Sequence, residues 1–127
     1  MPQKRVLIVE DEPIIARDLE ETLTRSGYTV TAIASSGEEA VKKVVEHRHD
    51  LVLMDIILKG SINSIETTVC IQARYDIPFV YLSAYSDSEV LKRAQKTYPY
   101  GYLIKPFTER ELAVAIEMAL FHHETNQ

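Results

Sequence analysis

Short apolar runs alternate with longer amphipathic segments along the chain, and this alternation limits the fold more than any other feature. Five runs rich in apolar residues lie at 6–9, 28–34, 51–54, 79–82 and 100–104. Strands this short and this apolar are typical of a parallel sheet that is covered on both faces. Because parallel strands need crossover connections, the segments between the runs are expected to be helices.

The intervening segments carry the signals of helices, which we predict over 13–26, 37–48, 65–75, 88–98 and 108–122. Pro13 suits a first helical turn and Gly27 a helix end. Thr108 and Glu111 form a capping box. The apolar spacing predicts these inward-facing residues: Ile15, Leu19, Thr22 and Leu23; Ala40, Val41, Val44 and Val45; Ile65, Val69 and Ala73; Val90, Leu91 and Ala94; and Leu112, Ile116, Ala119 and Leu120.

Five strand–helix units in succession predict an α/β fold, namely a doubly wound five-stranded parallel sheet with right-handed crossovers. The 127 residues suit a single domain spanning 1–127, and an apolar fraction of 46% supplies a core without disulfides or a structural metal. No apolar run approaches the roughly 20 residues that a membrane span needs, and no signal peptide is expected.

Composition also narrows the partners and the compartment. A net charge of −5 argues against binding nucleic acid through a basic face. The single cysteine, Cys70, excludes an internal disulfide and fits the cytoplasm. We expect Cys70 to be a small packed helix residue, His47 and His49 to be surface groups, and His122 and His123 to lie in a frayed, solvated end.

Polar residues follow four of the predicted strands directly. Glu10 and Asp11 end the first, Asp55 the third, Ser83 the fourth and Lys105 the fifth. In an open parallel sheet, ligands bind at the carboxyl ends of the strands. Any one of these residues alone is more simply explained as a cap, a turn residue or a solvated side chain. The joint pattern instead predicts a site at one edge of the sheet.

The residue types indicate the chemistry of this site. Neighbouring carboxylates repel one another, and a divalent cation such as Mg²⁺, or Mn²⁺ in its place, removes the conflict. None of the residues at these strand ends is His or Cys, which argues against zinc. With Lys105 and Ser83 beside it, the cation favours an anion with several oxygens, such as a phosphoryl group. Asp55 is then the natural nucleophile, because carboxylates form acyl phosphates.

Four motifs resemble the receiver domains of two-component response regulators, the CheY-like family. They are VLIVEDE at 6–12, LVLMDI at 51–56, FVYLSA at 79–84 and GYLIKPF at 101–107, in the order of the family and near its usual spacing. The resemblance covers essentially the whole chain. It implies a flavodoxin-like (βα)5 fold with the strand order 2-1-3-4-5.

The resemblance implies a phosphoacceptor and a metal site. Asp55 corresponds to the phosphoacceptor and Asp11 to a direct metal ligand. Glu10 corresponds to the acidic neighbour that acts through a metal-bound water. The main-chain carbonyl of Ile57 corresponds to the third protein ligand, so its side chain need not be polar.

The resemblance also implies a switch. Ser83 and Lys105 correspond to the family's hydroxyl and lysine, and the bond from Lys105 to Pro106 to its cis peptide. Tyr102 corresponds to the aromatic residue that turns inward when the hydroxyl is drawn toward the phosphoryl group. A homodimer or partner contact through the face formed by residues 88–122 is the expected output.

The chain departs from the family pattern in the loop after Asp55. The family usually has a proline and then Asp-Gly there, whereas this chain has Lys59, Gly60 and Asn63-Ser64 with one extra residue, so the metal loop is expected to differ in shape. Two positions that flank the site and are often polar in the family are Ile57 and Tyr85 here. Loop packing and tuning of the reaction rate are both open for them.

Together these features predict a signalling switch that takes a phosphoryl group from a histidine kinase or phosphotransfer protein and later hydrolyses it, without being an enzyme in the turnover sense. One alternative is a degenerate receiver that only binds partners, although none of the expected site residues is missing. Another is a phosphohydrolase with an aspartate nucleophile, which would want a carboxylate at Ile57. The kinase, the signal, the output and any larger parent protein stay open.

Overall fold

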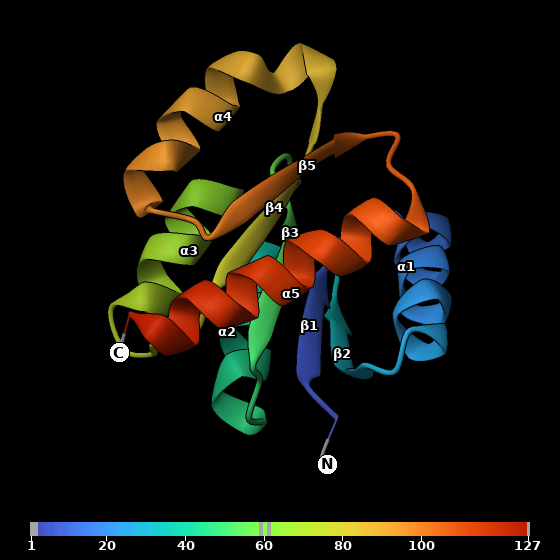
Figure 1. Cartoon of the computed structure of the whole chain (residues 1–127). Coiled ribbons are helices and arrows are strands. Elements are labelled where there is room, and N and C mark those ends of the chain that lie inside the picture. The colour runs from blue at the N-terminus through green and yellow to red at the C-terminus, as the bar shows by residue number, and fades with distance from the viewer. Residues whose placement is uncertain (1–2, 59, 61, 127) are drawn as a thin grey trace.

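The five predicted strands form one parallel sheet. The computed structural model describes residues 3–58, 60 and 62–126 (Figure 1). The sheet has the order β2-β1-β3-β4-β5, and all its neighbouring strands pair in parallel. The strands are β1 (Arg5–Val9), β2 (Thr29–Ala34), β3 (Leu51–Asp55), β4 (Phe79–Ala84) and β5 (Gly101–Lys105). The predicted doubly wound architecture and strand order are confirmed.

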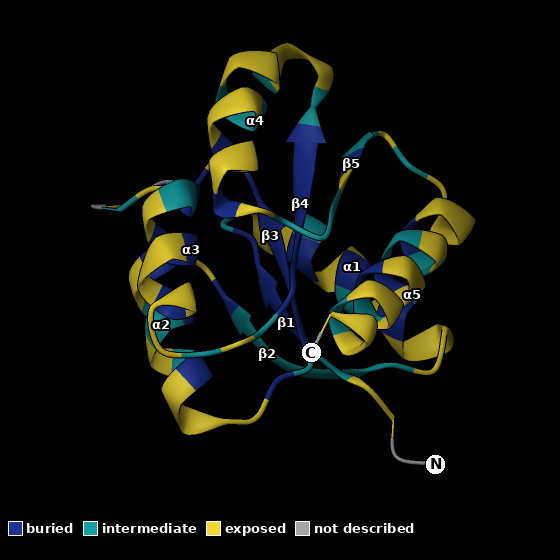
Figure 2. Cartoon of the chain, turned by 60° about the vertical axis from the view of Figure 1, so that its left-hand side comes forward, coloured by how far each residue is buried: buried dark blue, intermediate teal, exposed yellow. Residues whose placement is uncertain are grey.

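Helices cover both faces of this sheet. They are α1 (Pro13–Arg25), α2 (Gly37–Glu46), α3 (Ser64–Gln72), α4 (Ser88–Ala94) and α5 (Glu109–Thr125), and short 3₁₀ turns at Tyr85–Asp87 and Gln95–Thr97 flank α4. Figures 1 and 2 show α2, α3 and α4 on one side and α1 and α5 on the other. Each side has its own apolar core, and the central strands β1 and β3 are buried on both faces (Figure 2).

Helix α3 turns a polar face inward, which the apolar spacing did not predict. Its buried residues are Ser64, Thr67, Thr68 and Ile71. Of the residues predicted to face inward, Ile65 is only partly buried, Val69 is 55% exposed and Ala73 is exposed. Hydroxyl groups bury here at low cost because Thr67 and Thr68 donate to main-chain carbonyls one turn earlier, at 2.8 and 2.9 Å.

Three further expectations about helix faces and packing were wrong. Cys70 is exposed on the outer side of α3. Val45 of α2 is 68% exposed, because the buried stripe of that helix is narrower than its apolar spacing. His49 is buried and bridges two elements: its Nδ1 lies 2.6 Å from Thr31 Oγ1 and its Nε2 lies 2.9 Å from the Lys43 carbonyl. Burial lowers the pKa of His49.

The last helix extends beyond its predicted end at His122. Helix α5 continues through Thr125. His123 Nε2 lies 3.1 Å from an oxygen of Asp76, and its ring makes an edge contact with Tyr100. None of the helices in the part of the chain that the structure describes is long and apolar enough to cross a membrane.

Candidate functional site

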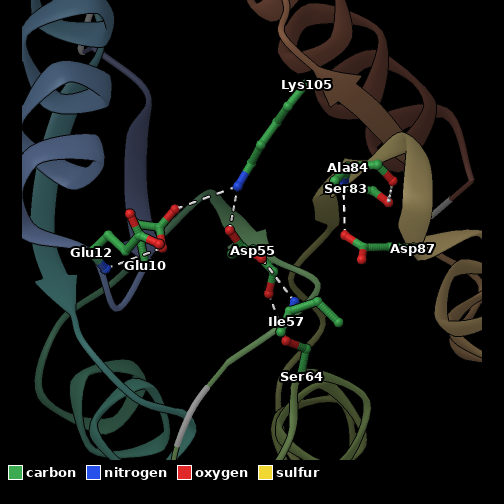
Figure 3. Close-up of polar contacts among 9 residues, drawn as sticks. All are labelled: Glu10, Glu12, Asp55, Ile57, Ser64, Ser83, Ala84, Asp87 and Lys105. Atoms are coloured by element: carbon green, nitrogen blue, oxygen red, sulfur yellow. Dashed lines mark hydrogen bonds and ion pairs between the residues drawn. The ribbon is translucent and has the colours of Figure 1, made fainter.

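The carboxyl edge of the sheet brings three of the predicted residues together. Glu10 follows β1, Asp55 ends β3 and Lys105 ends β5. Lys105 Nζ lies 2.5 Å from Asp55 Oδ2 and 3.8 Å from Glu10 Oε1 (Figure 3). The lysine side chain therefore reaches from the outer strand β5 toward β3 and β1, where its charge lies beside two carboxyl groups.

Asp55 is held by contacts from three segments. Its Oδ2 accepts from Lys105, and its Oδ1 accepts from the main-chain N–H of Ile57 at 2.8 Å. Its main-chain carbonyl accepts from the Ser64 hydroxyl at 2.6 Å (Figure 3). The side chain of Asp55 is 10% exposed, so the carboxylate reaches solvent but has little freedom to turn.

Glu10 is the carboxyl group of the site whose ionised form is least stabilised by its surroundings. Its Oε2 accepts from the main-chain N–H of Glu12 at 3.3 Å, whereas its buried Oε1 has no hydrogen-bond partner. Burial, and then the charge of Asp55, raise the pKa of Glu10 from 4.5 to about 8. A buried carboxylate oxygen without a donor, next to a second carboxylate, favours a cation.

The pKa of Lys105 is also raised, which favours its charged form. Burial alone would lower the pKa of its ammonium group. The hydrogen bond and the charge of Asp55 outweigh burial, so the pKa of Lys105 rises above its ordinary 10.5. The lysine thus stays charged throughout the neutral range and can accompany an anion at Asp55.

The Ser83 hydroxyl is bonded to a neighbouring carbonyl, and Tyr102 lies at the surface. The buried hydroxyl of Ser83 donates to the Ala84 carbonyl at 3.1 Å, and Tyr102 is 50% exposed on β5. The Lys105–Pro106 peptide bond is cis, as the resemblance implied. The side chains of Ser83 and Tyr102 lie on β4 and β5, the strands on one side of Asp55 in the sheet.

The predicted metal residues are donors of the right kind, but they do not form a ready-made cage. Among the residues that the structure describes, no three His, Cys, Asp or Glu side chains converge on one point. Asp11 is partly buried, and the main-chain N–H of Ile57 donates to Asp55 Oδ1. The orphaned oxygen of Glu10 and the all-oxygen donor set fit Mg²⁺, which keeps several waters and needs few protein ligands.

Two expectations about the loops around the site can be compared with the structure. Tyr85 is 88% exposed and Ile57 is 47% exposed, so neither side chain is buried in loop packing. Lys59, which marks part of the unusual loop, lies outside the described residues. Sequence reasoning missed Ser64 at this site, because a serine at a helix start is usually explained by capping.

Comparison with known proteins identifies the family of this chain. Residues 6–117 match the family described as response regulator receiver domain. The chain belongs to the response regulator receiver domain family. It is thus a signalling domain of the kind found in two-component systems.

The most informative relatives are regulators. The chain is 38% identical over 117 residues to the transcriptional regulatory protein PdtaR of Mycobacterium tuberculosis, covering 92% of this chain and 57% of that protein. It is 32% identical over 122 residues to the DNA-binding response regulator MtrA of Mycolicibacterium smegmatis, covering 96% and 53%. The chain therefore spans about half the length of these relatives.

Solved structures of receiver domains have the same fold as this chain. The signal receiver domain of a modulated diguanylate cyclase from Desulfovibrio desulfuricans G20 superposes with a TM-score of 0.92 at 34% identity, covering 99% of this chain and 100% of that one. The N-terminal domain of a response regulator/sensory box/GGDEF 3-domain protein from Carboxydothermus hydrogenoformans gives 0.89 at 39% identity, covering 97% and 98%.

Proposed function

We propose that Asp55 accepts a phosphoryl group from a histidine kinase or phosphotransfer protein in a reaction that depends on Mg²⁺. The proposal rests on the grouping of Asp55, Lys105 and Glu10 at the carboxyl edge of the sheet. One oxygen of Glu10 has no hydrogen-bond donor and could face a cation. A kinase partner, and a single cysteine that cannot form an internal disulfide, favour the cytoplasm.

The transfer follows from the contacts of Asp55. One carboxylate oxygen attacks the phosphorus atom, the bond from phosphorus to the donor nitrogen breaks, and that nitrogen keeps the electron pair. Lys105 moves with the transferred oxygens and compensates their charge. Hydrolysis reverses the state: water attacks the phosphorus, the acyl phosphate bond breaks, and inorganic phosphate leaves.

The metal would be held by residues already at the edge. Asp11, Asp55 and the main-chain carbonyl of Ile57 would be direct ligands, with Glu10 acting through water. Mg²⁺, or Mn²⁺, would supply positive charge to the phosphoryl oxygens. This chemistry needs no second acid–base carboxylate, so Ile57 suits a switch better than a turnover phosphohydrolase.

The switch would pass through Ser83 and Tyr102. A phosphoryl group of about two negative charges can shift an equilibrium only if one state holds it better. If Ser83 exchanges its contact with Ala84 for a phosphoryl oxygen, Tyr102 gains room to turn inward. The face over 88–122 would then change shape and strengthen a homodimer or partner contact.

Labelling tests the acceptor. Incubation with acetyl phosphate and Mg²⁺ should add one base-labile phosphoryl group to the wild type and none to Asp55→Asn. Asp18→Asn, at an exposed position on α1, is the matched control and should be labelled normally. Label that persists in Asp55→Asn would refute the assignment.

Amide exchange tests the switch. With a phosphoryl mimic bound, protection should change across residues 84–105 as well as in the loops around Asp55. Sedimentation of the same samples would report any dimer. A change confined to those loops would exclude the 88–122 face as the output surface.

A further inference from the structure

Ser64, the first residue of α3, is completely buried beside the proposed acceptor. Its hydroxyl donates to the main-chain carbonyl of Asp55 at 2.6 Å, nine residues earlier in the chain. Figure 3 shows it below Asp55, on the side away from Lys105.

This contact differs from the other two that hold Asp55. Ile57 N–H and Lys105 bind the two carboxylate oxygens, which must change partners when a phosphoryl group is attached and a cation approaches. The main-chain carbonyl takes no part in that chemistry. The bond from Ser64 can therefore persist through the reaction while the carboxylate contacts are exchanged.

The orientation of Ser64 is itself secured from α3 and β4. Thr68 Oγ1 donates to the Ser64 carbonyl at 2.9 Å and accepts from the Tyr81 hydroxyl at 2.7 Å. Tyr81 also lies 3.0 Å from Thr97 Oγ1. All four residues are buried, where an unsatisfied hydroxyl is costly, so the chain of hydroxyls disfavours any other arrangement of this helix start.

We propose that Ser64 is a positioning residue for phosphoryl transfer: it anchors the Asp55 peptide so that the carboxylate keeps its line of attack while its own contacts change. The inference rests on the proposed role of Asp55 as phosphoacceptor. Reaction rates are sensitive to the position of the attacking atom, so losing the anchor slows the reaction even though Ser64 touches no reacting atom.

Two variants of the same helix separate positioning from stability. Ser64→Ala removes the anchor, whereas Thr67→Val removes another buried hydroxyl of α3, which donates to the Asn63 carbonyl and not to Asp55. With acetyl phosphate and Mg²⁺, Ser64→Ala should be phosphorylated roughly tenfold more slowly, a fraction of the roughly 100-fold that a displacement of about 1 Å at the attacking atom can cost. Thr67→Val should stay within about twofold of the wild type, although both variants unfold at lower urea concentrations.

A spectroscopic readout tests the contact without phosphorylation. In the carbonyl carbon spectrum of the unmodified protein, the Asp55 signal should move upfield in Ser64→Ala and stay in place in Thr67→Val. Equal rates for Ser64→Ala and the wild type would overturn the proposal, as would slowing in both variants in proportion to lost stability. Failure of the wild type to accept label at Asp55 would instead overturn the proposed function, and this inference with it.

Discussion

Replacing Glu10 with glutamine should make the metal-free protein more resistant to alkaline pH, although it removes a proposed contributor to cation binding. Glu10 is 2% exposed, and its Oε1 lacks a hydrogen-bond donor. Burial and the charge of Asp55 raise its pKa from 4.5 to about 8. The folded protein therefore holds a proton that the unfolded chain releases above pH 4.5, and the resulting stability is lost as the pH rises through 8.

The size of the effect follows from these two pKa values. Protonation of Glu10 contributes about 1.4 kcal/mol more to the free energy of unfolding at pH 7 than at pH 9. Lys105 does not titrate in this window, because its pKa is raised above 10.5. Glutamine is neutral at every pH and has no such dependence.

Urea unfolding in EDTA at pH 7 and pH 9 measures the effect. The wild type should lose about 1.4 kcal/mol more than Glu10→Gln between the two pH values, since the titrations that both proteins share cancel. Glu12→Gln, at an exposed position, should behave like the wild type. If the wild type and Glu10→Gln lost equal free energy of unfolding between pH 7 and pH 9, the raised pKa of Glu10 would be refuted.

Three other expectations test separate parts of the structure. Asp11→Ala should weaken Mg²⁺ binding in a calorimetric titration and nearly stop phosphorylation by acetyl phosphate; unchanged affinity would contradict its proposed role as a ligand. Tyr81→Phe should lower the free energy of unfolding by about 1–2 kcal/mol, because it leaves two buried threonine hydroxyls with one contact fewer. Stability should fall as the pH drops below about 6.5, because burial lowers the pKa of His49 and the unfolded chain takes up its proton first. A His49→Gln variant that keeps the full acid sensitivity would contradict this explanation.

The five strands, and the meeting of three polar residues at their carboxyl ends, were predictable from the sequence. The apolar runs place all five strands, and the short runs bounded by polar residues mark where each strand ends. Parallel strands end at one edge, so Glu10, Asp55 and Lys105 had to meet there. The motif resemblance added the strand order, which local patterns do not contain.

Only the tertiary structure decided which polar groups are buried and what they bind. Ile65 and Val69 suggested the inward face of α3, yet Ser64 and Thr68 occupy it. His49 can also be buried, because its ring nitrogens have hydrogen-bond partners at Thr31 and Lys43 on two other segments. The spacing of apolar residues along the chain predicts which face of a helix is buried only when that face is apolar. A hydroxyl or an imidazole can be buried when a donor or acceptor from elsewhere in the chain lies within hydrogen-bond distance. Only the tertiary structure determines whether such a partner is there.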